Sequence, residues 1–372
     1  MINRLKALLY SSYICCKTHV VERRRWQHVT HPEKQVKVYY GHDHIPLPGE
    51  KAAGGIVKCQ DLQQLFPNTI QNANILYLVS SALPPFPMLV VQYARKKGVK
   101  IIVNQNGVAI PAYHGNNLEV INGPRRFLIQ QADHVIYQSE YCKVSSDRFL
   151  GLRSSSFTIL HNPVDISFFN MRERLGTATR PKILMTGSHG RFYRVSSAID
   201  IVAALATMGV DAELVIAGRL AWHADLSICV AELFAYGAKK GIHKRITHMG
   251  TYSQTEAPAV YQQADIFLHT QYNDACPRVI VEAMSSGLPI VYSASGGVPE
   301  LVGRKAGIGI EVPNDWDRIH EPNPENAAKA IRQIIDSYQV FSQNARDRAV
   351  REFDLRPWLA HHQRLFEELC QL

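Results

Sequence analysis

Two acidic residues, Asp274 and Glu282, flank a predicted helix start in residues 273–300, which read NDACPRVIVEAMSSGLPIVYSASGGVPE. Pro277 suits the first position of a helix, because its missing N–H has no partner to lose there. The unbonded amides around Pro277 and Val279 would then make an anion site at the helix N-terminus. These residue types at this spacing could hold a phosphate together with several sugar hydroxyls.

The residues after this helix predict a short strand followed by a glycine-rich loop. Gly287 is a natural stop for the helix, and Pro289 prevents its continuation. The apolar residues 290–292 then form a strand. Gly296 and Gly297 free the backbone to approach a ligand.

This segment resembles the donor-binding signature of retaining family 4 glycosyltransferases (glycosyl transferases group 1), which have the GT-B fold. The signature has an acid, seven residues, Glu, and then Ala-Met and Gly-Leu-Pro, as here. The resemblance implies that Glu282 binds the ribose of a sugar nucleotide and that Asp274, where the family usually has Glu, contacts the donor sugar. It also implies donor binding by Pro277, Arg278 and Val279. The alternative is that both acids cap and solvate an ordinary helix.

A second glycine turn, residues 186–194 (TGSHGRFYR), follows the first predicted strand of the second half. A Gly turn with basic side chains suits a diphosphate. By the family resemblance, Gly187, Arg191 and Arg194 would contact the donor phosphates. The lysine that the family has a few residues later is absent, with Ser196 or Ser197 in that region. The alternative is that both arginines are solvated loop residues.

Three further positions are expected to contact substrate on the resemblance. Gly54 and Gly55 stand where the family has a Gly-Gly loop near the donor phosphates and the acceptor; the alternative is a plain strand-to-helix turn. Asn106 stands where the family has a histidine, and an amide cannot transfer a proton at neutral pH. Gly250 belongs to a segment that resembles the family's nucleotide-base wall.

No metal site is expected. The strongest candidate is the cluster His42, Asp43 and His44. Its residues i and i+2 could share one face of an extended chain, but no third ligand is evident, so a role in a loop is favoured. The resemblance implies a nucleotide-diphosphate sugar as donor substrate, with no cofactor and no metal.

Composition indicates a globular chain of 372 residues, long enough for two domains, with no apolar run long enough to span a membrane. The seven cysteines are scattered without a C-x-x-C pair, which favours a reducing cytoplasm. The net charge is +9, and residues 1–37 hold eight Lys/Arg and two Asp/Glu. This segment predicts a basic helix on an anionic membrane surface, at the inner face of the membrane, or a solvated helix packed on the first domain. Nucleic-acid binding is not expected, because the patch lacks interleaved aromatic residues.

Strand and helix patterns alternate from residue 35 onward, with a break at residues 161–181. Such alternation predicts parallel sheets covered by helices on both faces. The expected fold class is therefore α/β, with two doubly wound Rossmann-like domains facing a central cleft, as in GT-B. The predicted parts are a basic extension (1–34), a first domain (35–165), a second domain (166–355) and a C-terminal helix (356–372). The family resemblance implies that the first domain is the acceptor side, that the second binds the donor nucleotide, and that the last helix crosses back to the first domain.

The expected function is that of a retaining, hexosyltransferase-type glycosyltransferase. It would move a sugar from a nucleotide-diphosphate sugar to a hydroxyl of a glycan, lipid-linked or polysaccharide-type acceptor, as in polysaccharide biosynthesis. Two alternatives stay open: a nucleotide-sugar epimerase or hydrolase on the same fold, and a non-catalytic protein that binds sugar nucleotides. The sequence does not define the sugar, the base or the acceptor.

Overall fold

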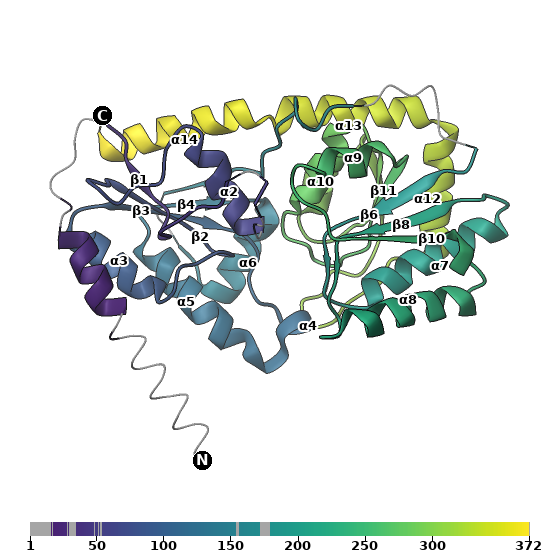
Figure 1. Ribbon diagram of the computed structural model, residues 1–372, viewed down its shortest axis with the longest axis horizontal. Helices are drawn as coiled ribbons and strands as arrows, with labels where there is room; N and C mark the ends of the chain where they lie inside the picture. Colours follow the sequence, from purple (N-terminus) through teal and green to yellow (C-terminus); the bar gives the residue numbers. More distant parts are fainter. Residues whose placement is uncertain are drawn as a thin grey trace, which may run out of the picture.

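The computed structural model describes residues 16, 18–27, 29, 35–47, 49–50, 52, 54–153, 156–171 and 179–371. Two parallel sheets lie side by side, each covered by helices on both faces (Figure 1). The expectation of two Rossmann-like α/β halves is therefore confirmed.

The first half holds a five-stranded sheet in the order β1-β2-β3-β4-β5. Its elements are β1 (Val38–Tyr39), α2 (Gly54–Gln63), β2 (Ile75–Val79), α3 (Pro87–Lys96), β3 (Lys100–Gln105), α4 (Pro111–His114), η1 (Gly115–Asn117), α5 (Leu118–Gln131), β4 (His134–Tyr137), α6 (Glu140–Leu150) and β5 (Phe157–Ile159). Strand β2, ILYLV, is buried along its whole length, as expected for a strand covered on both faces.

The second half holds a six-stranded sheet in the order β10-β8-β6-β11-β12-β13. Its elements are β6 (Lys182–Met185), β7 (Ser188–His189), α7 (Tyr193–Thr207), β8 (Glu213–Ala217), β9 (Arg219–Leu220), α8 (Leu226–Lys239), η2 (His243–Arg245), β10 (Ile246–Gly250), α9 (Ala257–Gln262), β11 (Ile266–His269), α10 (Arg278–Ser285), β12 (Ile290–Ser293), α11 (Val298–Val302), β13 (Gly307–Ile310), α12 (Pro324–Asp336) and α13 (Tyr338–Glu352). The short strands β7 and β9 pair separately.

The last helix, α14 (Leu355–Cys370), returns to the first half and lies along its sheet (Figure 1). Its apolar residues Trp358, Leu365 and Phe366 share a core with strands β1, β2 and β3. The chain thus crosses between the halves a second time. The two crossings are bonded to each other, because Val164 N–H donates to the Phe353 carbonyl over 2.8 Å and Leu355 N–H donates to the Val164 carbonyl over 3.1 Å.

A helix in residues 18–27 packs on the first half next to α3 (Figure 1). Trp26 is buried, and its indole N–H donates to the buried carboxylate of Glu22. Arg25 pairs with Glu22 and with Asp43. The rest of the predicted basic extension, residues 1–15 above all, lies outside the described residues. Within the described part of the chain, no helix combines the length and apolarity needed to cross a bilayer.

One helix start differs from the sequence-based expectation, and two other helices place residues that matter for the site or for sequence signals. Helix α10 begins at Arg278, and Pro277 is its N-cap, with an extended backbone (φ −71°, ψ 119°), so the expectation of Pro277 as the first helical residue was wrong by one position. Helix α7 begins at Tyr193, which places Arg194 inside the helix. Helix α5 begins at Leu118 and continues through Pro124, a residue that normally marks a helix end.

Candidate functional site

Two adjoining cavities open between the halves of the molecule and share Ser188 in their walls. The larger, about 600 Å³, lies against the start of α10, and we call it the α10 cavity. The smaller, about 490 Å³, contains Asp274 in its wall, and we call it the Asp274 cavity. Both have the size of small-molecule sites. Residues from both halves line each of them, which matches the rule that doubly wound sheets bind ligands beyond the carboxyl ends of their strands.

Glu282 is a wall residue of the α10 cavity, and both of its carboxylate oxygens are held. Oε1 accepts a hydrogen bond from Arg278 Nε at 3.1 Å, and Oε2 accepts one from the Tyr261 hydroxyl at 2.9 Å. Tyr261 is fully buried, so its ring gives the contact a rigid base. A carboxylate fixed in this way can accept hydrogen bonds from ligand hydroxyls through its remaining lone pairs.

Arg278 connects Glu282 to the opposite half of the molecule. Its Nη1 forms an ion pair with Asp61 on α2, while its Nε binds Glu282. Burial alone would lower the pKa of Arg278, but the carboxylates of Asp61 and Glu282 more than offset this and raise it. A permanently charged guanidinium therefore lies between two carboxylates at the floor of the cleft.

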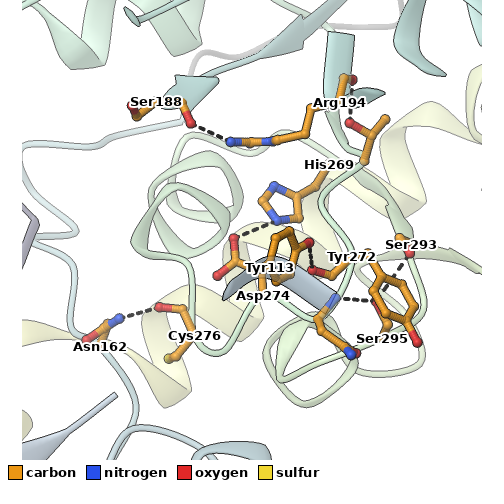
Figure 2. A network of polar contacts seen from close by, with 12 residues as sticks. Tyr113, Asn162, Ser188, Arg194, His269, Tyr272, Asp274, Cys276, Ser293 and Ser295 are labelled. Carbon is orange, nitrogen blue, oxygen red and sulfur yellow. Dashed lines mark hydrogen bonds and ion pairs between the residues drawn. The ribbon is translucent and has the colours of Figure 1, made fainter. Parts of the chain in front are cut away.

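Asp274 is held in place by a tightly bonded loop. Its Oδ2 lies 3.1 Å from Nε2 of the buried His269, and Figure 2 shows the carboxylate facing that ring, with the Arg194 guanidinium nearby. The preceding residue, Asn273, adopts a left-handed backbone (φ 49°) and donates its N–H to Ser295 Oγ. Such strained positions persist only where the surroundings fix them.

The loop with Gly296 and Gly297 approaches the protein's own backbone. A Cβ on Gly296 would lie 2.2 Å from the Asp274 carbonyl oxygen, and one on Gly297 would lie 2.0 Å from the Ala275 carbonyl oxygen. Gly297 N–H donates to the Asp274 carbonyl over 2.8 Å. These glycines therefore let the loop pack closely against the segment that carries Asp274.

Two arginines of the second glycine turn line the Asp274 cavity. Arg194 is 7 % exposed, and its Nη1 donates to the Ser188 carbonyl over 2.6 Å (Figure 2). Its Nε is buried without a protein partner. Burial lowers the pKa of Arg194, opposed by the charge of Asp274. Arg191 is more exposed. It lies over the ring of Tyr113, which belongs to the other half, and donates a hydrogen bond to the Tyr113 carbonyl.

The remaining predicted residues divide into two groups. Gly54, Gly187 and Val279 line the α10 cavity, and Asn106 lines the Asp274 cavity, where its Oδ1 accepts from Ser80 Oγ at 2.6 Å. The others, Gly55, Gly250 and Pro277, line neither cavity. Gly55 packs on Ser81 and Ala82 at distances that only glycine allows, and the Gly250 carbonyl accepts from Gly218 N–H.

The metal candidate from the sequence is not assembled. His42 Nε2 donates to the Ala82 carbonyl, Asp43 pairs with Arg25, and His44 Nε2 lies 3.5 Å from Glu50. Across the residues described, no three His, Cys, Asp or Glu side chains are grouped so that they could hold a metal ion.

Sequence reasoning missed three residues of the site: Asp61, His269 and Tyr261. Their roles depend on contacts with Arg278, Asp274 and Glu282, and Asp61 lies 217 positions from Arg278 along the chain. None of the three belongs to a local motif, so only the fold brings them to the site.

Solved structures with a similar fold are glycosyltransferases and related enzymes. The crystal structure of Anabaena Alr3699/HepE in complex with UDP superposes with a TM-score of 0.62 at 20% identity, over 81% of this chain and 79% of that chain. Sucrose-phosphate synthase from Thermosynechococcus elongatus has a TM-score of 0.64 at 15% identity, over 81% of this chain and 75% of that chain. The chain therefore has the GT-B fold, as the sequence predicted.

A family model also matches the second half of the chain. Residues 167–348 match the model described as glycosyl transferases group 1. The matched segment contains Arg191, Arg194, Asp274 and Glu282. The resemblance to glycosyl transferases group 1, inferred from residues 273–300, is therefore confirmed.

Curated relatives match at lower coverage. Spore coat protein SA of Bacillus subtilis (strain 168) is 24% identical over 226 residues, which are 56% of this chain and 57% of the relative. The phosphatidylinositol N-acetylglucosaminyltransferase GPI3 subunit of Saccharomyces cerevisiae (strain RM11-1a) is 24% identical over 272 residues, 71% of this chain and 56% of the relative. D-inositol 3-phosphate glycosyltransferase of Mycobacterium sp. (strain KMS) is 25% identical over 183 residues, 47% of this chain and 40% of the relative. The chain spans about half the length of these relatives.

Proposed function

We propose that the protein is a retaining, hexosyltransferase-type glycosyltransferase that moves a sugar from a nucleotide-diphosphate sugar to an acceptor hydroxyl. The observation that carries the proposal is the pair of carboxylates Glu282 and Asp274. Each is held by a buried partner, and each faces one of two adjoining cavities that meet at Ser188. Two such sites in series suit a nucleotide on one side and a sugar on the other.

In this proposal the ribose hydroxyls bind Glu282 and the donor sugar binds Asp274. The leaving diphosphate lies between them, near the start of α10 and Arg194. Backbone amides at a helix start and an arginine both stabilise the negative charge that develops on a departing diphosphate. The buried, unpartnered Nε of Arg194 offers a donor for it. The charge is then neutralised by protein groups, and we propose no metal or cofactor.

The acceptor and the location are further parts of the proposal. We propose a glycan, lipid-linked or polysaccharide-type acceptor, and the names of two relatives, which refer to phosphatidylinositol and D-inositol 3-phosphate, support the lipid-linked kind. The free thiols Cys16, Cys59, Cys142, Cys229, Cys276 and Cys370 support a cytoplasmic location. We also propose that the exposed Arg23 and Arg24, on the helix in residues 18–27, help to hold the protein on an anionic membrane surface, which vesicle binding would test.

The proposal is tested by nucleotide binding in the Glu282→Gln variant. The full chain is screened by thermal shift against UDP, GDP, ADP, TDP and CMP, with Glu325→Gln on α12 as a control outside both cavities. Hydrogen bonds to a charged group contribute about 1.5–3 kcal/mol, so Glu282→Gln should weaken the preferred nucleotide at least tenfold and lower turnover. Arg278 keeps Asp61 as a partner in this variant, so the fold should persist.

Other outcomes would favour other functions. Consumption of the sugar nucleotide without any acceptor would favour an epimerase or a hydrolase. Tight binding without turnover would favour a non-catalytic binding protein. Binding in Glu282→Gln equal to that of the wild type would remove Glu282 from the ribose site. NMR of the product anomer would test retention.

A further inference from the structure

Arg125 is a cation of the Asp274 cavity that the proposed donor site does not use. It lies on α5, in the first half of the molecule, and it lines the cavity together with Asn106. Its Nε donates to the Ser80 carbonyl over 3.4 Å, and Ser80 Oγ in turn bonds Asn106. This contact ties the guanidinium to the part of the wall that the first half provides, whereas Arg191 and Arg194 come from the second half.

No carboxylate neutralises Arg125 within the described ranges of the chain. No ion pair joins it to an Asp or Glu there, and burial is the cause that lowers its pKa. A guanidinium stays charged at every accessible pH, so a half-buried one without a counter-charge is costly to maintain. The next arginine, Arg126, differs in this respect, because both of its terminal nitrogens bond the carboxylate of Glu119.

The cavity as a whole carries excess positive charge. Its walls hold Arg125, Arg191 and Arg194 against a single carboxylate, Asp274. Burial lowers the pKa of His114 in the same wall, although its bond to the Ile110 carbonyl opposes this, and the charges of Arg125 and Arg191 lower it further. Arg125 and Arg191 therefore both act on His114 as positive charges, and among the described residues no carboxylate forms an ion pair with Arg125.

We propose that Arg125 is a specificity-determining residue that binds an anionic group, a phosphate or a carboxylate, on the acceptor substrate. The inference rests on the proposed glycosyltransferase function and narrows its acceptor to an anionic one. The guanidinium has free N–H groups in the planar arrangement that matches the two oxygens of such a group. Asn106 and Tyr141 on the same side of the cavity can bind the neutral hydroxyls of that substrate.

The experiment measures binding of inorganic phosphate by calorimetry to the full chain, alone and with the preferred nucleoside diphosphate at saturation. Acetate is titrated in parallel, so that the two arms separate a phosphate from a carboxylate preference. The variants are Arg125→Gln and, as the matched control from the next position of the same helix, Arg126→Gln. Arg125→Lys keeps the charge and removes the planar donor pair.

We expect phosphate or acetate to bind the wild type with the nucleotide in place. Arg125→Gln should weaken that binding at least tenfold, Arg125→Lys should weaken it less, and all variants should bind the nucleotide within twofold of the wild type. Unchanged anion binding in Arg125→Gln would overturn the proposal, as would complete loss of anion binding in the wild type when the nucleotide is bound. Failure of the wild type to bind any of the nucleotides would instead contradict the glycosyltransferase function. In that case the titration without nucleotide would still test anion binding by Arg125.

Discussion

His362 is a single residue whose protonation state the fold controls. Its Nδ1–H donates to the Trp358 carbonyl over 2.9 Å, and its Nε2 accepts from the Tyr77 hydroxyl at 3.1 Å. The Tyr77 oxygen already accepts a hydrogen bond from Asn104 Nδ2, so the Tyr77 hydroxyl acts as the donor toward His362 and accepting from a protonated His362 would be costly. The neutral imidazole is therefore fully bonded, and burial lowers the pKa of His362 to about 3.

This pKa predicts a loss of stability in acid. The unfolded chain takes up a proton near pH 6.5 and the folded chain does not, so the contribution of His362 is complete above pH 6.5 and declines as the pH falls toward 3. Between pH 7 and pH 5 the free energy of unfolding should fall by about 2 kcal/mol from this residue. In His362→Gln, which does not titrate, urea unfolding at the two pH values should show a loss smaller by that amount. An equal loss in variant and wild type would contradict the assignment.

The residues of the candidate site were predictable where one short segment holds them. Asp274, Glu282 and the start of α10 follow from spacing, helix signals and the family resemblance. Asp61 was not predictable, because its contact with Arg278 joins segments 217 positions apart and leaves no local pattern. His269 and Tyr261 lie 5 and 21 positions from the carboxylates that they hold, but neither belongs to a recognised motif.

At the scale of elements, helix 18–27 carries the proposed membrane contact. Trp26 is 1 % exposed, so deleting this helix would also disturb the core, and charge substitution is the better test. A basic residue near an anionic surface contributes about 1 kcal/mol. Arg23→Gln with Arg24→Gln should therefore weaken sedimentation with phosphatidylglycerol vesicles by roughly 30-fold.

The control for this experiment removes the same charge elsewhere. Arg332→Gln with Arg351→Gln, on α12 and α13 of the second half, should leave vesicle binding near the wild-type value. Equal loss in both double variants would indicate a general effect of net charge. No loss in either would remove the helix from this role.

The core of each sheet was predictable from short runs of apolar residues, but strand β13 was not. Strand β13 reads GIGI, and Gly307 is needed because a Cβ there would lie 2.0 Å from the Ile290 carbonyl oxygen. Glycine-rich strands lack the usual signature. The start of helix α12 differs from β13 in this respect, because the N-cap Asn323 and the following Pro324 are recognisable helix-start signals.

At the scale of the whole molecule, each half extends a contact into the other. Tyr113 on α4 bonds the Tyr193 hydroxyl and the Tyr272 carbonyl of the second half. In the opposite direction, Trp316 stacks on Tyr141 with ring centroids 5.2 Å apart, and its carbonyl accepts from Ala112 N–H. These reciprocal contacts lie beside the Asp274 cavity, which Tyr113 and Tyr141 line.

Trp316→Ala should loosen this arrangement. Aromatic pairs contribute about 0.5–1.5 kcal/mol each, and Trp316 contacts Phe149 as well as Tyr141. The two halves of the unliganded protein should therefore separate more often in this variant. Small-angle scattering should show a larger radius of gyration without ligand, and donor hydrolysis should rise relative to transfer because water enters the cleft. Trp222→Ala, whose ring packs on Phe192 within the second half, is the control and should change neither quantity. An unchanged radius in Trp316→Ala would mean that other contacts hold the halves together.

The return of α14 to the first sheet also has a consequence for the order in which the chain is made. Strands β1 to β5 are complete once residue 159 has left the ribosome, but the apolar face that α14 covers waits for nearly two hundred further residues to be synthesised. During that interval the first half exposes Tyr77, Val38 and their neighbours to the cell. Nascent chains halted before residue 355 should therefore recruit chaperones, and full-length chains should release them when Trp358 and Phe366 dock.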